Sequence, residues 1–344
     1  MLRRDCVLGK AGVALLALLV ALPASGAAAA RSGAKAPSFK KARSFDVGPS
    51  PKALASGDFD ADSRLDFAVA GGREVSVLRG AERGKLTATV AVPLDSPALD
   101  VEAVTLPGDG DPDLLVASGG SLLTLSGGAG ATFSPTRTLP LSGGPLAALA
   151  TADLNADGLT DVAASRPNED DIAVLPGLPD GGFGSPVRLA SPGPGIDFGA
   201  VVALPLDADA LPDLVATRSD GSLSTWITRP GLTFGTPIPT FVGAERLGLT
   251  TGDFDGDRRE DVAAARHLSR QNQIVVLLSN GQGALRPEEP RKLGSKGGPV
   301  GPLATGDFNG DGRADVLAGY ARSGRVALAR SMRGGGLGKP SFTK

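Results

Sequence analysis

Short apolar runs and polar turns alternate along the chain in units of 47 to 54 residues. In each unit an apolar run such as residues 201–204 leads into an acidic loop, and a second run such as 162–164 leaves it. An alternating stretch such as 274–278 follows, and then a glycine-rich turn and a fourth stretch such as 182–189. Runs of this length, bounded by Gly and Pro, are typical of β-strands. The pattern therefore predicts four short strands in each unit.

Acidic loops of nine residues mark the units, and each loop ends in an aspartate. They are residues 58–66, 105–113, 153–161, 205–213, 253–261 and 307–315. The closing aspartates are 47, 48, 52, 48 and 54 residues apart, which indicates internal repetition. A four-stranded unit of about 50 residues has the size of a propeller blade. The sequence predicts an all-β fold, a β-propeller of six four-stranded blades, with seven blades as the alternative if one unit has diverged.

The two ends of the repeat region are expected to meet. Residues 39–51 have the pattern of a fourth strand but precede the first acidic loop. The chain stops soon after residues 338–342, where the last unit would begin its own fourth strand. We expect residues 39–344 to form a single propeller domain whose N-terminal strand completes the last blade and closes the ring, since closure removes exposed sheet edges.

Residues 1–30 have the layout of a secretory signal peptide. Arg3, Arg4 and Lys10 precede the apolar run 11–22, and Pro23 and small residues follow it. The run is shorter than the ~20 residues that a membrane span needs, so cleavage is favoured over a retained anchor helix. We expect a secreted, extracytoplasmic product, with residues 31–38 as a short linker before the domain.

Composition and charge narrow the function classes. The chain has 49 Gly, 27 Pro, one His and one Cys, so most His- or Cys-based catalysis and ordinary zinc sites are excluded. Its formal charge is −2, and removal of residues 1–30, which carry a net +2, leaves −4. A chain without a basic field is not expected to bind nucleic acid. Cys6 is removed with the signal peptide, and no second apolar span follows, so we expect a disulfide-free monomer without a membrane span.

Oxygen-bearing residues at loop positions 1, 3, 5 and 9 are the main chemical signal. A tight loop can turn these side chains toward one centre, where a hard cation relieves their repulsion; Ca²⁺ takes six to eight oxygen ligands. A backbone carbonyl at position 7 would add another ligand. The candidate ligands are Asp58, Asp60, Asp62, Asp66, Asp153, Asn155, Asp157, Asp161, Asp207, Asp209, Asp213, Asp253, Asp255, Asp257, Asp261, Asp307, Asn309, Asp311 and Asp315.

The loops differ in how complete this ligand set is. The first, third, fifth and sixth loops are complete, whereas the fourth has Pro205 at position 1 and is expected to bind weakly. The second keeps only Asp109 and Asp113 in register, with Asp111 displaced, and little binding is expected there. In the alternative interpretation the carboxylates merely cap turn N–H groups. We predict about four strong calcium loops and one weak one, and the ions would stabilise a chain that lacks disulfides.

These motifs resemble the FG-GAP/VCBS repeat family, which is similar to the propeller of integrin α chains. Residues 252–257 and 306–312 are similar to the family's calcium motif, and 183–186 and 234–237 to its Phe-Gly element. The resemblance covers residues 39–344 and implies a propeller with calcium loops on an exported protein. It implies no single activity, because family members serve adhesion, sugar binding and, less often, catalysis.

A non-catalytic binding or adhesion scaffold, with a protein or polysaccharide ligand, is the function that the sequence favours. A carbohydrate-binding module is the alternative, with Trp226 and Tyr320 as candidate sugar-stacking rings. However, Trp226 lies in the alternating stretch 223–227, which favours packing between blades. The sequence predicts the fold more firmly than the ligand.

An enzyme such as a polysaccharide hydrolase or lyase is the third alternative. Paired carboxylates serve such chemistry, but each dense carboxylate cluster here fits the repeated loop better. His267 is interpreted as a surface or packing residue. Basic groups such as 40–43, or Arg286, Arg291 and Lys292, are interpreted as solvated faces, with an anionic polymer as the lesser alternative.

Overall fold

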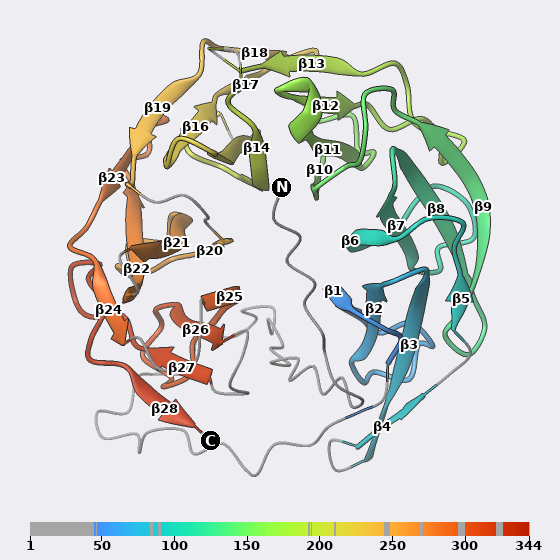
Figure 1. The fold of residues 1–344 in the computed structure, drawn as a ribbon, viewed down its shortest axis with the longest axis horizontal. Coiled ribbons are helices and arrows are strands. Elements are labelled where there is room, and N and C mark those ends of the chain that lie inside the picture. The colour runs from blue at the N-terminus through green and yellow to red at the C-terminus, as the bar shows by residue number, and fades with distance from the viewer. Residues whose placement is uncertain are drawn as a thin grey trace, which may run out of the picture.

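Six antiparallel sheets of four or five strands surround a central axis in the computed structural model of the chain (Figure 1). The structure describes residues 45, 47–82, 85–88, 91–191, 193, 195–209, 211–243, 248–268, 271–294, 300–320 and 326–343. Each sheet is one blade, and its strands follow chain order from the axis outward. The predicted six-bladed β-propeller is therefore confirmed, and the seven-bladed alternative is wrong.

The blades are built from the following strands. Blade I contains β1 (Pro51–Gly57), β2 (Asp66–Gly71), β3 (Glu74–Ala81), β4 (Lys85–Ala88) and β5 (Val92–Pro93). Blade II contains β6 (Ala98–Val104), β7 (Asp113–Ser118), β8 (Ser121–Gly128) and β9 (Thr132–Pro140). Blade III contains β10 (Ala148–Ala152), β11 (Asp161–Arg166), a short 3-10 turn η2 (Pro167–Glu169), β12 (Asp171–Leu175) and β13 (Val187–Ala190).

The second half of the ring repeats the arrangement. Blade IV contains β14 (Phe198–Leu204), β15 (Asp213–Arg218), β16 (Ser222–Trp226) and β19 (Ile238–Phe241), with the small hairpin β17 (Thr228–Arg229) and β18 (Thr233–Phe234). Blade V contains β20 (Gly248–Gly252), β21 (Asp261–Leu268), β22 (Gln271–Ser279), β23 (Leu285–Pro287) and β24 (Arg291–Gly294). Blade VI contains β25 (Val300–Gly306), β26 (Asp315–Tyr320), β27 (Val326–Ala329) and β28 (Ser341–Thr343).

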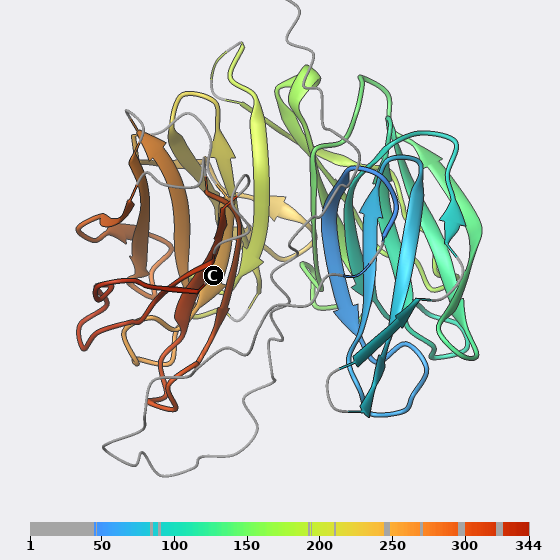
Figure 2. The same cartoon turned by 60° about the horizontal axis from the view of Figure 1, so that its bottom comes forward.

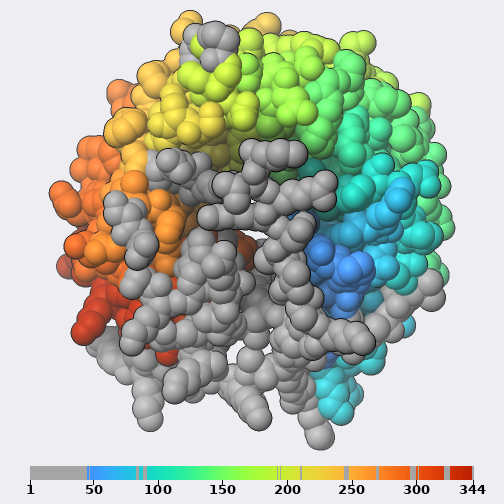
Figure 3. Space-filling model, viewed as in Figure 1, coloured from blue at the N-terminus to red at the C-terminus, as the bar shows by residue number. Residues whose placement is uncertain are grey.

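Apolar side chains on both faces of each blade pack against its neighbours. All residues of β2, β7, β11 and β15 are buried, which explains why these strands read as continuous small apolar runs rather than as alternating ones. For example, Trp226 and Phe198 of blade IV, whose ring centroids are 5.4 Å apart, share one apolar cluster with Ile172 of blade III. Blades I to V form a continuous wall in the space-filling view (Figure 3).

The last blade is completed by the C-terminal end of the chain, so the expected ring closure by an N-terminal strand is wrong. Strand β28 pairs with β27 and forms the outer edge of blade VI. A short hairpin needs less loop-closure entropy than pairing with residues almost 300 positions away. Phe45 and Val47 instead pack against blade I, and Pro51 starts its inner strand. The expected signal peptide, linker and residues 39–44 lie outside the described residues.

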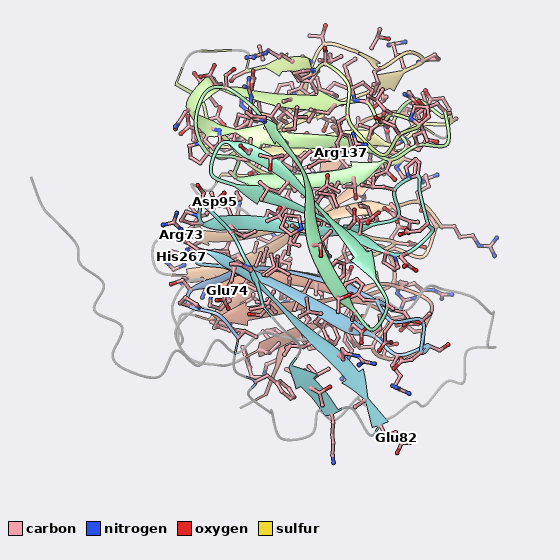
Figure 4. The ribbon with its side chains drawn as sticks, turned by 90° about the vertical axis from the view of Figure 1, so that its right-hand side faces the viewer. Arg73, Glu74, Glu82, Asp95, Arg137 and His267 are labelled. Carbon is pink, nitrogen blue, oxygen red and sulfur yellow. The ribbon has the colours of Figure 1, made fainter. Side chains whose placement is uncertain are left out.

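The acidic loops lie together on one face of the ring. Each joins the first strand of a blade to the second, and the blades share one topology about one axis (Figure 2). Glu74 and Glu82, at opposite ends of β3, mark the two faces, and Glu82 lies on the side of the acidic loops (Figure 4). Among the described residues, no helix is long and apolar enough to cross a membrane.

Candidate metal-binding loops

The closing aspartate of every loop bridges the loop to the end of the third strand of its blade or to the residues just beyond it. Asp66 Oδ2 accepts a hydrogen bond from the Phe59 N–H (2.8 Å), and its Oδ1 accepts one from the Gly80 N–H (2.7 Å). The same two bonds, 2.7 to 3.2 Å long, recur at Asp113, Asp161, Asp213, Asp261 and Asp315. The closing carboxylate is thus a structural staple even in the second loop, where the ligand set is incomplete.

Burial of these carboxylates changes their acidity. Burial raises the pKa of Asp213, Asp261 and Asp315 to about 6, against the opposing effect of their N–H donors. The other carboxylates of each loop raise the pKa further, because like charges disfavour ionisation. A bound cation would lower these pKa values, because its charge favours the ionised carboxylates.

The first aspartate of each complete loop organises the turn. Asp58 Oδ1 and Oδ2 accept the N–H groups of Asp62 (3.0 Å) and Ser63 (2.8 Å). Asp153, Asp253 and Asp307 cap their own loops in the same way. The capping that was the alternative to metal binding is therefore present. It does not exclude a cation, because a carboxylate oxygen has two lone pairs.

Two loops bring three carboxylates to one point. Ligand oxygens of Asp58, Asp60 and Asp66 lie within 4.8 Å of one another, as do those of Asp253, Asp255 and Asp261. Two oxygens bound to the same Ca²⁺ at ~2.6 Å can be at most about 5.2 Å apart. Positions 1, 3 and 9 of the first and fifth loops therefore fit a calcium ion.

The position-5 aspartates do not join these carboxylate groups in the structure. The Asp62 and Asp257 carboxylates instead form ion pairs with the neighbouring Arg64 and Arg259, and Asp311 pairs with Arg313 in the same way. These arginines are at position 7, so their side chains compete for the carboxylate while their carbonyls are the expected ligands. Binding through position 5 would require these exposed ion pairs to open, at a cost of about 1 kcal/mol or less each.

Asparagine replaces aspartate at position 3 of the third and sixth loops. Asn155 Oδ1 accepts the Asp157 N–H (2.9 Å), which leaves this amide oxygen inside the loop. In the sixth loop the Asn309 Nδ2 lies 3.3 and 3.4 Å from the two oxygens of Asp315. Turning that amide over would present its oxygen to a cation and remove the donor from Asp315.

The fourth and second loops hold fewer ligands. Asp207 and Asp209 each accept one N–H two residues further on (3.0 and 2.9 Å). In the second loop Asp109 accepts the Asp111 N–H (3.1 Å). No carboxylate occupies position 1 in either loop, so the described geometry there is that of capped turns.

An acidic pair on the inner strand of blade II was missed by the repeat-based analysis. Asp100 Oδ2 accepts the Leu149 N–H (2.7 Å) and so ties β6 to β10 of the next blade. Burial raises the pKa of Asp100 to about 6 and that of Glu102 to about 8, where the Asp100 charge adds to the effect. Two acids within a strand that carries no acid in the other blades were the signal for this pair.

The candidate sugar-stacking rings lie in the interior. Trp226 is buried between blades, as its alternating context predicted. Tyr320 is buried as well, and its hydroxyl donates to the Leu293 carbonyl (2.5 Å). His267 is half-buried on β21, with Nδ1 2.7 Å from Asn272 Oδ1 (Figure 4).

Two grooves lie at equivalent positions where the outer strand of one blade meets the next blade. The first, of 380 Å³, is lined by Arg166, Arg188 and Phe183 among others. The second, of 370 Å³, lies between β19 and blade V and is lined by Arg266 and by Phe241, which is 75% exposed. Both volumes fall within the range of small-ligand sites.

Sequence comparison agrees with the loop geometry. Residues 106–164 and 253–318 match the family model described as an FG-GAP-like repeat. These stretches are FG-GAP-like repeats. They contain the second, third, fifth and sixth acidic loops, and the resemblance drawn from the motifs is confirmed. No curated protein matches the chain.

Solved structures similar to this propeller have different functions. A lectin from Agrocybe aegerita, which recognises non-reducing terminal N-acetylglucosamine, has a TM-score of 0.61 at 15% identity, over 86% of this chain and 80% of the lectin. A periplasmic gluconolactonase from Pseudomonas aeruginosa has a TM-score of 0.67 at 15% identity, over 87% of this chain and 86% of the enzyme. A protein from Lactobacillus plantarum has a TM-score of 0.62 at 14% identity, over 85% and 84%. At these identities the likeness establishes the fold alone.

Proposed function

We propose that the protein is an exported calcium-binding β-propeller that acts as a non-catalytic binding or adhesion scaffold. The observation that carries the proposal is the convergence of three carboxylates at each of two loops. Asp58, Asp60 and Asp66 would bind one calcium ion. A second ion would be bound by Asp253, Asp255 and Asp261. Bound calcium would neutralise the charge of each loop and fix the face on which the loops lie.

Calcium removal tests the metal part of the proposal. At a tenfold excess over its dissociation constant, one ion stabilises the folded state by about 1.4 kcal/mol. Four such sites would contribute about 5–6 kcal/mol, which is comparable with the ~5–15 kcal/mol stability of a whole domain. We expect the melting temperature of chelator-stripped protein to rise with added Ca²⁺ and to rise less with Mg²⁺. An unchanged melting temperature, together with no bound calcium in native mass spectrometry, would contradict the proposal.

Export is supported by the layout of residues 1–30. Expression of the full chain in a secreting host should release a product that lacks these residues. The mass of the secreted protein and its N-terminal sequence would show where cleavage occurs. Retention of the whole chain in the cell would contradict export.

Carbohydrate binding is the second candidate, and the Phe241 groove favours it. The exposed Phe241 ring lies beside Arg266, and Glu288 and Arg286 supply an acceptor and a donor on the other wall. An aromatic face flanked by polar groups of both kinds suits a pyranose ring. The similar lectin structure gives this candidate further support.

A glycan array with the native protein and two variants tests the second candidate. Phe241→Ala should abolish any sugar signal, whereas Phe342→Ala, which alters a 44% exposed phenylalanine on β28, should leave it intact. Sugar binding that survives Phe241→Ala would place the site elsewhere. If the natively folded protein binds no sugar on the array, a protein ligand would be favoured.

A further inference from the structure

The third strand of blade I places an arginine on the first acidic loop. Arg79 Nε donates to Asp60 Oδ2 (2.7 Å), and Arg79 Nη2 contacts the same oxygen. The Asp60 side chain is 2% exposed, whereas that of Arg79 is 40% exposed. A buried position-3 carboxylate is therefore neutralised by a cation that enters from the solvent side.

The fifth loop has the same three carboxylates, but among the described residues no third-strand arginine bonds its position-3 Asp255, although the charge of Arg259 acts on it from a distance. Arg79 directly precedes Gly80, whose N–H binds the closing Asp66. The residue at this place in blade V is Leu278, which precedes Ser279 and packs in the apolar cluster between blades V and VI. The two loops therefore form a natural comparison, with similar ligand geometry and a different charge beside position 3.

Blade VI carries the arginine without its acidic partner. Arg330 precedes Ser331, the donor to Asp315, but position 3 of that loop is the neutral Asn309. Nε of Arg330 has no hydrogen-bond acceptor in the described part of the chain. Among the described loops, the first alone combines a third-strand arginine with a position-3 carboxylate.

We propose that Arg79 is an internal counter-ion of the first loop, which a calcium ion must displace from Asp60. The inference rests on the calcium function proposed above. Asp60 Oδ1 is buried and has no hydrogen-bond donor among the residues that the structure describes, so it is ready to bind a cation, whereas Oδ2 is held by the guanidinium. Because an entering Ca²⁺ meets a fixed positive charge, the first loop binds calcium more weakly than the fifth.

The same contact gives Arg79 two effects of opposite sign. Without calcium, Arg79 stabilises the fold, because Asp60 would otherwise be a buried carboxylate without a partner. With calcium, Arg79 opposes the ion. Removal of the Arg79 charge should therefore lower the stability of the apo protein and raise the calcium affinity of the first loop, whereas a purely structural residue would lower both.

The test compares three single variants of the full chain by calcium titration calorimetry and native mass spectrometry. Arg79→Gln should strengthen one site at least tenfold, equivalent to about 1.4 kcal/mol. Arg79→Lys keeps the charge and should give a smaller gain. Arg137→Gln is the matched control, because it removes the same charge from an exposed pair with Asp180, outside the acidic loops; we expect a change below about threefold. Adding Asp60→Asn to Arg79→Gln should cancel the gain.

The outcomes separate this inference from the calcium function itself. If the native chain binds no calcium, the proposed function fails. If the native chain binds calcium and Arg79→Gln leaves every site unchanged while its circular dichroism spectrum stays native, the counter-ion role is wrong. A gain that Arg137→Gln reproduces equally would show a general charge effect and would also overturn the role of Arg79. Thermal melts in chelator check the predicted loss of apo stability.

Discussion

Replacing Asp113 separates the structural role of the closing aspartate from metal binding. The second loop lacks carboxylates at positions 1 and 3, so an effect there owes nothing to a cation. Asp113 is 6% exposed and accepts the N–H groups of Leu106 (3.1 Å) and Gly127 (3.0 Å). Asp113→Ala leaves both donors without an acceptor and detaches the loop from β8.

The magnitude follows from these two bonds. A hydrogen bond to an ionised group contributes about 1.5–3 kcal/mol, and burial of the charge, which raises the pKa of Asp113, offsets part of that. We expect a net loss of about 3 kcal/mol in the free energy of unfolding. For a chain of this size that corresponds to a melting temperature about 6 °C lower.

Thermal unfolding followed by circular dichroism, in calcium and in chelator, checks this expectation. The loss should be equal in both conditions. Asp109→Ala in the same loop is the control, since it removes one exposed turn bond and should change the stability by less than about 0.5 kcal/mol. Equal melting temperatures for the two variants, or a loss confined to calcium buffer, would refute the staple role.

Three further predictions concern other parts of the fold. The pKa values of Asp100 (about 6) and Glu102 (about 8) are raised, so between about pH 4 and 8 the folded chain holds protons that the unfolded chain has released. The melting temperature should therefore fall as the pH rises through this range. Glu102→Gln should make this fall smaller, and an unchanged dependence on pH would contradict the role of Glu102. Arg166→Met should destabilise by about 3 kcal/mol in urea unfolding, because the buried Asp171 keeps only the longer contact to Arg188 (3.5 Å), and Arg166→Met with Asp171→Leu should recover most of the loss. The single tryptophan, Trp226, should resist acrylamide quenching until the chain unfolds, whereas quenching of the native protein would contradict its buried position.

The blade count and the loop positions were predictable because both are periodic. Each closing aspartate is followed by a small apolar strand, so its register survives even where the second loop has lost other ligands. Small residues such as Ala68 and Ala163, which are fully buried between blades, mark the second strands in the same way. One acidic loop followed by a small apolar strand is weak evidence for a blade, but six such units at similar spacing are strong evidence for a propeller.

Features that depend on tertiary contacts could not be predicted from the sequence pattern. The segments 39–51 and 338–343 both look like outer strands, and only the short hairpin before β28 decides between them. Arg79 meets Asp60 across 19 residues of chain, because β3 runs back beside the loop. The N–H groups that donate to Asp66 come from two different segments of the chain. The sequence alone therefore did not distinguish a structural role of Asp66 from a role as a metal ligand.

Completion of blade VI by β28 gives every blade a contiguous stretch of chain. The segment from the first strand of a blade to its outer strand never borrows a strand from elsewhere in the sequence. A tandem duplication or deletion of one genetic unit would therefore add or remove one whole blade without rethreading the others. A ring assembled by such copying would leave each acidic loop free to gain or lose its acids independently of the others.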